Sequence, residues 1–350
     1  MTRPVADRRA EADRFDLRRI HPVLRFGSMS DRYAAWLDQI YPRDVWAGEV
    51  TSRKKSVGGQ SYDERLLPTA SVDDYFQHFG VLEIDFTYYR PLIEATGKPS
   101  QNLFTLEHYA DASPANARFL LKAPQQFVAR RLRRKVDGRL AYVDNLDFLD
   151  AEAFTSRFVV PAQKKLGVKL AGIIVEQPYE RARESPPPEQ FVAEWDRFLA
   201  DVPNDAAYHL EVRSSHQLSP AYLEWVANAE VGFCFSHWRW LPPIVDQWRL
   251  AGERFTSASG EAVIRLVQPR DMDFATSWRL AYPFEGPAAG LSDNREARRM
   301  VDETTALMYQ AVEAGVVLNV IGNNRAWGNT PDLGRTLAHR FLDFAERKGA

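Results

Sequence analysis

Two carboxylates interrupt an apolar run in the stretch VLEIDFTYYRP at residues 81–91. Glu83 and Asp85 alternate there with large apolar residues, which is the spacing of a strand whose two faces differ. A carboxylate in a partly desolvated site can exchange protons near neutral pH, and it can also bind a divalent metal ion. The stretch therefore points to acid/base chemistry or to ligand binding.

Further polar residues stand in five later apolar runs of the same kind. Glu211, for example, lies between Leu210 and Val212. Cations at such positions are suited to hold the negative charge of a ligand, and amides can hydrogen-bond it. The set comprises Lys122, Glu176, Glu211, Arg213, Arg265, Asn319 and Asn323.

The elements that must position these residues are short apolar runs separated by segments with helical spacing. Most of these runs are nearly continuous in apolar residues, as is typical of parallel strands buried on both faces. Eight alternating strand and helix units predict an α/β fold, a single (β/α)8 TIM barrel, in preference to a doubly wound open sheet. The predicted strands are 23–28, 81–87, 118–124, 171–178, 208–214, 231–237, 262–269 and 316–323.

We predict a barrel domain over residues 22–348, an N-terminal arm at 1–21 and an enlarged first loop at about 48–66. Successive strand residues point alternately into a barrel and out toward its helices. With Leu82 and Ile84 outward, the polar residues named above face inward and gather toward the carboxyl end of the strands, which we call the barrel mouth. Characterised TIM-barrel enzymes have their active sites at that end.

Composition limits the class of protein. The chain has 350 residues, 45% hydrophobic and 26% charged, with a net charge of −2, which argues against a wholly basic nucleic-acid binder. Its one cysteine, Cys234, cannot form an internal disulfide, and the amino terminus lacks the apolar segment of a signal peptide. No apolar run is long enough to span a membrane, so we expect a cytoplasmic protein without a membrane partner.

Six motifs in fixed order resemble the YecE-like family, also called domain of unknown function 72. They are FGSMSDRYAAWLDQIYP (Gly27, Ser28, Trp36, Tyr41, Pro42), LEIDFTYYRP (Glu83, Thr87, Tyr89), FLLKAP (Phe119, Lys122, Pro124), IIVEQP (Gln177, Pro178), LEVR (Glu211, Arg213) and GNN (Asn323, Asn324). The resemblance runs from about residue 22 to 345. It implies a TIM barrel and no established reaction.

The sequence departs from that family pattern at two places. The pattern has Arg-x-His-Gly after the seventh strand, whereas here Arg265 is followed by Gln268 and no histidine. Where a Trp often follows the Glu-x-Arg motif, this chain has His216. If that histidine takes part in a reaction of the family, this protein either is a divergent enzyme or has lost the reaction.

The polar interior has two interpretations. The charged residues are either satisfied by one another as interior salt bridges, or they form a site. For a site, we expect an anionic (phosphorylated) or polyhydroxylated small ligand. Its binding residues would be Lys122, Arg213, Arg265, Tyr89, Asn323, Asn324, Glu176 and Asp85, with Glu83 and Glu211 as acid/base candidates.

Other functions stay open at this point. One alternative is a phosphodiesterase or nuclease that uses a divalent metal on the carboxylates, with the basic run 130–135 contacting nucleic acid. We expect that basic run to lie on a solvated helix face instead. His237 could add a nitrogen ligand to the carboxylates if a metal bound, but we assign no metal-binding residues. A second alternative is a non-catalytic ligand-binding or scaffold barrel. The sequence predicts neither a required cofactor nor an oligomeric state.

Overall fold

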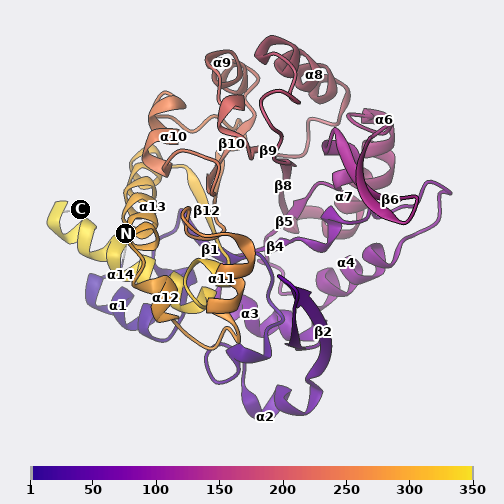
Figure 1. Ribbon diagram of the computed structural model, residues 1–350. Coiled ribbons are helices and arrows are strands. Elements are labelled where there is room, and N and C mark those ends of the chain that lie inside the picture. The colour runs from indigo at the N-terminus through magenta and orange to yellow at the C-terminus, as the bar shows by residue number, and fades with distance from the viewer. Residues whose placement is uncertain (1–2, 349–350) are drawn as a thin grey trace.

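Each of the eight apolar runs overlaps a strand, and the eight strands close into a parallel barrel surrounded by helices (Figure 1). In this computed structural model, which describes residues 3–348, the order around the barrel is β1-β12-β11-β10-β9-β8-β5-β4, with β4 pairing back to β1. The barrel strands are β1 (Leu24–Ser28), β4 (Val81–Ile84), β5 (Phe119–Lys122), β8 (Leu170–Gln177), β9 (Tyr208–Val212), β10 (Gly232–His237), β11 (Glu261–Leu266) and β12 (Val317–Gly322). The predicted single TIM barrel is confirmed.

The helices cover the outer face of the barrel and bury its apolar side chains. Trp195, Phe198 and Tyr222 are among the largest side chains packed in this layer. The α-helices are α1 (Val5–Asp13), α2 (Arg43–Trp46), α3 (Val72–His78), α4 (Gln101–Ala112), α5 (Gln125–Val128), α6 (Ala151–Phe154), α7 (Val160–Leu166), α8 (Pro188–Asp201), α9 (Pro220–Asn228), α10 (Ile244–Leu250), α11 (Phe274–Ala281), α12 (Ala289–Ser292), α13 (Arg295–Ala314) and α14 (Thr330–Lys348). No helix within residues 3–348 combines the length and apolar character that crossing a membrane requires.

Two antiparallel hairpins extend the loops that follow β1 and β5. The enlarged first loop contains β2 (Thr51–Val57) and β3 (Gln60–Leu66), which pack on α11 through Val57 and Trp278. The second hairpin consists of β6 (Arg131–Val136) and β7 (Arg139–Asp144). The basic run 130–135 therefore lies mainly on a strand, and its predicted place on a helix face is wrong. An Asp-Gly turn at Asp137 and Gly138, both with positive φ, makes the hairpin favourable.

The segment before the first strand lies against the barrel. Helix α1 packs on α14, and Ala12, Leu17 and Ile20 are fully buried. Residues 1–2, which belong to the predicted N-terminal arm, lie outside the described residues. The described part of that arm thus contributes to the core.

The barrel interior has a polar amino end, an apolar middle and a charged carboxyl end. Arg25 and Glu261 pair at the amino end, with N and O atoms 2.6 Å apart. Six side chains form the apolar middle: Val81, Leu120, Ile174, Cys234, Val263 and Ile321. Each is two residues from a polar position in its strand, so the predicted alternation places the polar side chains on the barrel axis.

Candidate functional site

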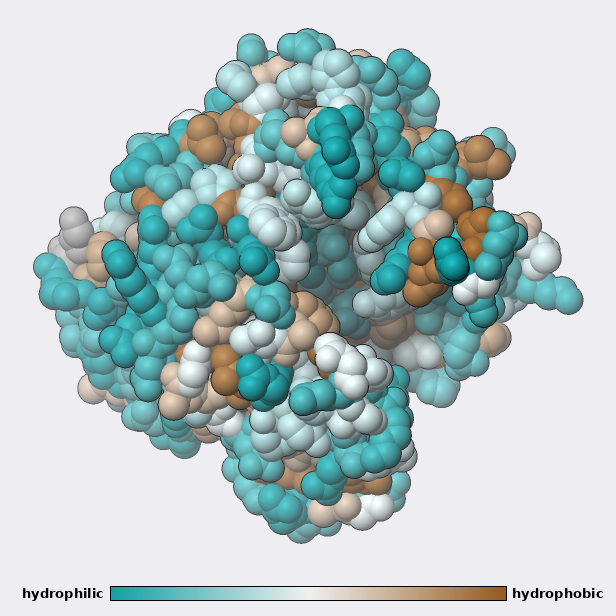
Figure 2. All heavy atoms as spheres, viewed as in Figure 1, coloured by the Kyte–Doolittle hydropathy of each residue, from teal (hydrophilic) through white to brown (hydrophobic). Residues whose placement is uncertain are grey.

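Six charged side chains from five strands meet above the apolar middle of the barrel. They are Glu83 after Leu82 on β4, Lys122 on β5, Glu176 on β8, Glu211 on β9 with Arg213 just beyond it, and Arg265 on β11. We call these six residues the ion-pair cluster. Figure 2 shows a recess with hydrophilic residues inside it, over the strands β4, β5 and β8 of Figure 1.

Arg265 contacts all three glutamates of the ion-pair cluster. Its Nε and Nη2 donate to the two carboxylate oxygens of Glu83 over 2.9 and 2.6 Å. Its Nη1 donates to Glu176 over 2.8 Å and also to Glu211. Burial by itself lowers the pKa of Arg265, but Glu211, Glu83 and Glu176 together raise it well above its ordinary value. This guanidinium is therefore a permanent charge inside the barrel.

One oxygen of Glu176 accepts from all three cations of the cluster. Lys122 Nζ, Arg213 Nη2 and Arg265 Nη1 lie 2.9, 2.6 and 2.8 Å from Oε2. Burial by itself raises the pKa of Glu176, but Arg213, Lys122 and Arg265 hold it well below its ordinary value. The second oxygen has no hydrogen-bond partner among residues 3–348 and faces the mouth as an available acceptor.

The cluster is electrically balanced, with three carboxylates and three cations. The side chains of Glu83 and Glu211 are 0% exposed, and both accept hydrogen bonds from Arg265. Lys122 also lies over the ring of Tyr88, with Nζ 4.0 Å from the centroid, and Arg213 stacks on Trp238 at 4.5 Å. This geometry is that of interior salt bridges, one of the two interpretations of the sequence. Two buried atoms of the cluster, Oε1 of Glu211 and Nε of Arg213, have no hydrogen-bond partner among residues 3–348.

Asp85 lies beyond the cluster, where β4 has ended and a 3-10 turn over Phe86–Tyr88 begins. No hydrogen bond or ion pair reaches its carboxylate from residues 3–348. Burial raises the pKa of Asp85 to about 6, although the charge of Lys122 opposes the shift. An unpaired carboxylate with this pKa can exchange protons near neutral pH.

Arg325 is a buried cation at the mouth that the sequence analysis did not select. Its Nε donates to Asn323 over 3.2 Å, its Nη1 donates to Gln268 over 2.8 Å, and the guanidinium lies 4.3 Å from the ring centroid of Phe274. No carboxylate among the described residues pairs with it. Burial lowers the pKa of Arg325 to about 10, so it remains protonated at neutral pH.

The unpaired charges of Asp85 and Arg325 both act on Tyr33. Burial is the main cause that raises the pKa of this phenol; Asp85 raises it further, and Arg325 lowers it. A carboxylate and a guanidinium without ion-pair partners thus share one region of the mouth. The sequence signal that could have identified Arg325 as a site residue is its position two residues after Asn323, in the loop after the eighth strand.

The remaining candidate residues differ in accessibility. Tyr89 is 72% exposed on the rim. The Oδ1 atom of Asn323 accepts from the backbone N and from Nε of Arg325, so this amide orients the guanidinium. Asn324 is buried, and its Oδ1 accepts from the backbone N and the hydroxyl of Thr330 at the start of α14.

The carboxylates do not form a metal-binding group. Within residues 3–348, no three His, Cys, Asp or Glu side chains are arranged to hold a metal ion. Burial lowers the pKa of His237 to about 4, and its Nδ1 lies 2.8 Å from the carbonyl oxygen of Gln268. His237 is therefore a neutral ring with a structural hydrogen bond.

Comparison with known proteins identifies the family. The family model described as protein of unknown function DUF72 matches residues 32–348. The chain belongs to the DUF72 family. Two solved members have the same fold. A DUF72 protein from Thermotoga maritima is 14% identical, with a TM-score of 0.52 over 93% of this chain and 99% of its own. One from Enterococcus faecalis is 13% identical, with a TM-score of 0.53 over 91% and 95%. No curated protein matches the sequence.

In this DUF72 protein, the side chain of Gln268 makes two hydrogen bonds in the segment after β11, where the family pattern has a histidine. Its side-chain oxygen accepts from Arg325, and its Nε2 donates to the carbonyl of Met272 over 2.7 Å. A neutral amide in contact with Arg325 leaves the guanidinium charge uncompensated.

Proposed function

We propose that the barrel mouth binds a small molecule that carries an anionic group, such as a phosphate, together with hydroxyl groups. The observation that carries this proposal is the guanidinium of Arg325, which is buried without a carboxylate partner. A buried charge without a counter-ion is costly, and an anionic ligand would supply the missing partner. Its Nη2 has no acceptor among the described residues and is free to donate to that ligand.

The ion-pair cluster has a different role in this proposal. Lys122, Arg213 and Arg265 were each expected to hold the negative charge of the ligand, but each already contacts a carboxylate. We propose that Arg325 binds the anionic group of the ligand and that the ion-pair cluster forms the floor of the binding site. There, the free oxygen of Glu176 can accept a hydrogen bond from a ligand hydroxyl, and Tyr89 can contact the ligand at the rim.

If the site catalyses a reaction, Asp85 is our proposed acid/base. Its carboxylate is unpaired and its pKa is raised to about 6, which is suited to proton transfer near neutral pH. Glu83 and Glu211 have less support, because both are fully buried and hydrogen-bonded to Arg265. A turnover assay on ligands that bind would separate an enzyme from a non-catalytic barrel.

The metal-dependent nuclease has less support than the anion site. Glu83, Glu176 and Glu211 each pair with at least one of the cations Arg265, Arg213 and Lys122, which compete with a metal ion for these carboxylates. We retain a cytoplasmic location in the proposal, since the single cysteine, Cys234, is a free thiol inside the barrel.

Isothermal titration calorimetry with inorganic phosphate and a panel of sugar phosphates would test the anion site. We expect Arg325→Gln to weaken binding by about 10- to 100-fold, because a hydrogen bond to a charged group contributes about 1.5–3 kcal/mol. Arg325→Lys should retain part of the affinity. The matched control is Arg249→Gln, which removes an exposed cation of α10. Wild-type affinity in Arg325→Gln, or no binding of any panel anion by the wild type, would contradict the proposal.

A further inference from the structure

The β6–β7 hairpin packs on the protein at its base, through Leu132, and is exposed on both faces beyond it. Its register pairs Arg133 with Tyr142 and Lys135 with Leu140. Leu132, which lies on the opposite face, is buried, so the face of these four residues points outward. Leu140 and Tyr142 are each 62% exposed. Figure 2 shows hydrophobic residues exposed among hydrophilic ones on the right, where Figure 1 places this hairpin.

The hairpin is also a concentrated patch of positive charge. Residues 130–145 contain six cations and two carboxylates, a net charge of +4 in a chain whose total is −2. Arg130 pairs with Glu194, and Arg131 lies near Asp144. The other four cations have no ion-pair partner within residues 3–348: Arg133, Arg134, Lys135 and Arg139. Like charges held together this closely favour an acidic partner.

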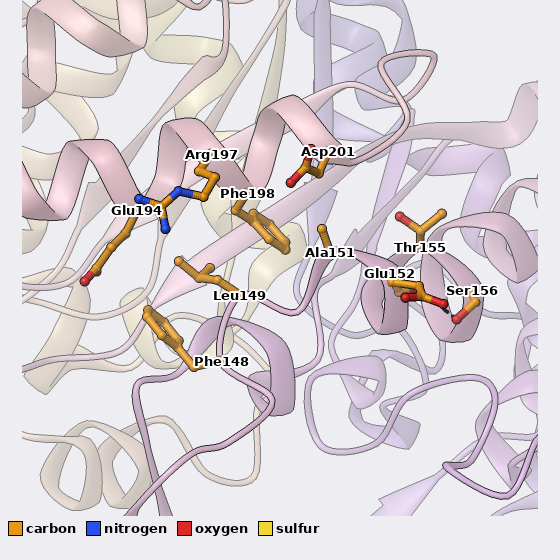
Figure 3. Close-up of a pocket in the computed structure, with 10 residues that line it drawn as sticks. All are labelled: Phe148, Leu149, Ala151, Glu152, Thr155, Ser156, Glu194, Arg197, Phe198 and Asp201. Carbon is orange, nitrogen blue, oxygen red and sulfur yellow. Dashed lines mark hydrogen bonds between the residues drawn. The ribbon is translucent and has the colours of Figure 1, made fainter.

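The groove lined by the residues that follow the hairpin is apolar and carries carboxylates that are unpaired within residues 3–348, so it complements the basic and apolar outer face of the hairpin. It has a volume of about 740 Å³ and lies between α6 and α8, with Phe148 and Leu149 presenting apolar surface (Figure 3). Glu152 from α6 and Asp201 from α8 line it without ion-pair partners among the described residues. Arg197 is the one cation in its lining.

We propose that the hairpin of one copy of this chain docks into the groove of a second copy, and reciprocally, in a twofold dimer. A twofold interface needs both complementary surfaces in one patch of each subunit. Here the hairpin ends at Asp144, and the groove lining begins four residues later at Phe148. Arg133 and Lys135 would meet Glu152 and Asp201, while Leu140 and Tyr142 would cover Phe148 and Leu149. This inference is independent of the anion site.

A charge exchange tests this dimer by size-exclusion chromatography with light scattering. One variant carries Arg133→Glu and Lys135→Glu, and the other carries Glu152→Lys and Asp201→Lys. We expect the wild type at the mass of two chains and each variant alone at the mass of one. An equimolar mixture should return to the mass of two chains, because both reciprocal contacts then join opposite charges.

Arg279→Glu on α11 is the matched control, since it reverses an exposed cation outside the patch and should leave the dimer intact. Circular dichroism checks that both variants fold. A monomeric wild type would overturn the proposal, as would dimeric variants or a mixture that stays monomeric. If the monomeric wild type binds duplex DNA in a gel-shift assay and the hairpin variant does not, the patch serves a nucleic acid instead.

Discussion

Arg265 joins carboxylates that come from three different strands of the barrel. Glu83 lies on β4, Glu176 on β8 and Glu211 on β9. Because all four groups are largely removed from water, each charge depends on its neighbours for stabilisation. The cluster therefore connects opposite walls of the barrel through one side chain.

We predict that Arg265→Met destabilises the protein strongly. The substitution keeps much of the side-chain volume but leaves the carboxylates of Glu83 and Glu211 buried without this partner. Loss of one partner from a buried ion pair costs about 3–5 kcal/mol. Chemical denaturation would measure the free energy of unfolding. Arg249→Met breaks an exposed pair with Asp246 and should cost less than about 1 kcal/mol; equal losses in the two variants would contradict the prediction.

The raised pKa of Asp85 makes the stability of the protein depend on pH. Its folded-state pKa of about 6 lies above its ordinary value of 3.8, so the folded protein holds this proton more tightly than the unfolded chain does. The resulting stabilisation is complete below about pH 3.8 and is lost as the pH rises through about 6. At higher pH, Asp85 is a partly buried, unpaired charge.

We therefore expect Asp85→Asn to be more stable than the wild type at about pH 8, by about 1–3 kcal/mol, and equal to it below about pH 3.8. Denaturation curves across this pH range would measure the difference. Asp137→Asn, in an exposed turn, is the control and should show no such trend. A difference that does not change with pH would mean that ionisation of Asp85 is not its cause.

At the level of elements, the β2–β3 hairpin is held on the rim by its packing on α11. Lys55 lies over the ring of Trp278 at 4.2 Å, and Tyr62 contacts the same ring edge-on. Gly58 approaches α11 so closely that a Cβ atom there would lie 2.8 Å from the Cβ of Ala275. Lys55 is also one of the charges that act on the pKa of Asp85. The hairpin therefore influences the mouth electrostatically.

We predict that Gly58→Ala loosens this hairpin more than Gly59→Ala does. Both glycines have positive φ, so both substitutions incur the same kind of backbone strain, about 1–2 kcal/mol. Only the methyl group at position 58 meets Ala275, whereas position 59 has open space. Hydrogen exchange over residues 51–66 should rise further in Gly58→Ala. Equal exchange in both variants would show that the contact with α11 contributes little.

At the scale of the whole molecule, the barrel could be predicted from the sequence because strands buried on both faces consist of short runs of apolar residues, which are easy to recognise. The runs around Ile174 and Phe235 are apolar regardless of their neighbours. The hairpins were not predicted, because their residues are largely exposed and carry little apolar pattern. Helix α4 was also not predicted. For α4, three buried residues, Leu103, Leu106 and Tyr109, are the main signal.

The candidate site was predictable in part for the same reason. Alternation within strands placed Glu83, Lys122 and Arg265 on the barrel axis, but it could not tell which charges pair there. Arg325 lies in a loop, where no periodicity applies, and its importance depends on Gln268, which comes from another strand's loop. Pairing across the barrel is a tertiary property that one sequence does not contain.

The packing of α1 on α14 has a consequence for the connectivity of the chain. Arg9 pairs with Asp343 and Glu346, so the first and last helices lie side by side, as Figure 1 shows. In the closed barrel, β1 has two strand neighbours and none of the eight barrel strands is at an edge. A circular permutant with its helices α14 and α1 joined by a short linker, and new ends in the exposed turn at residues 95–99, would keep every strand pairing.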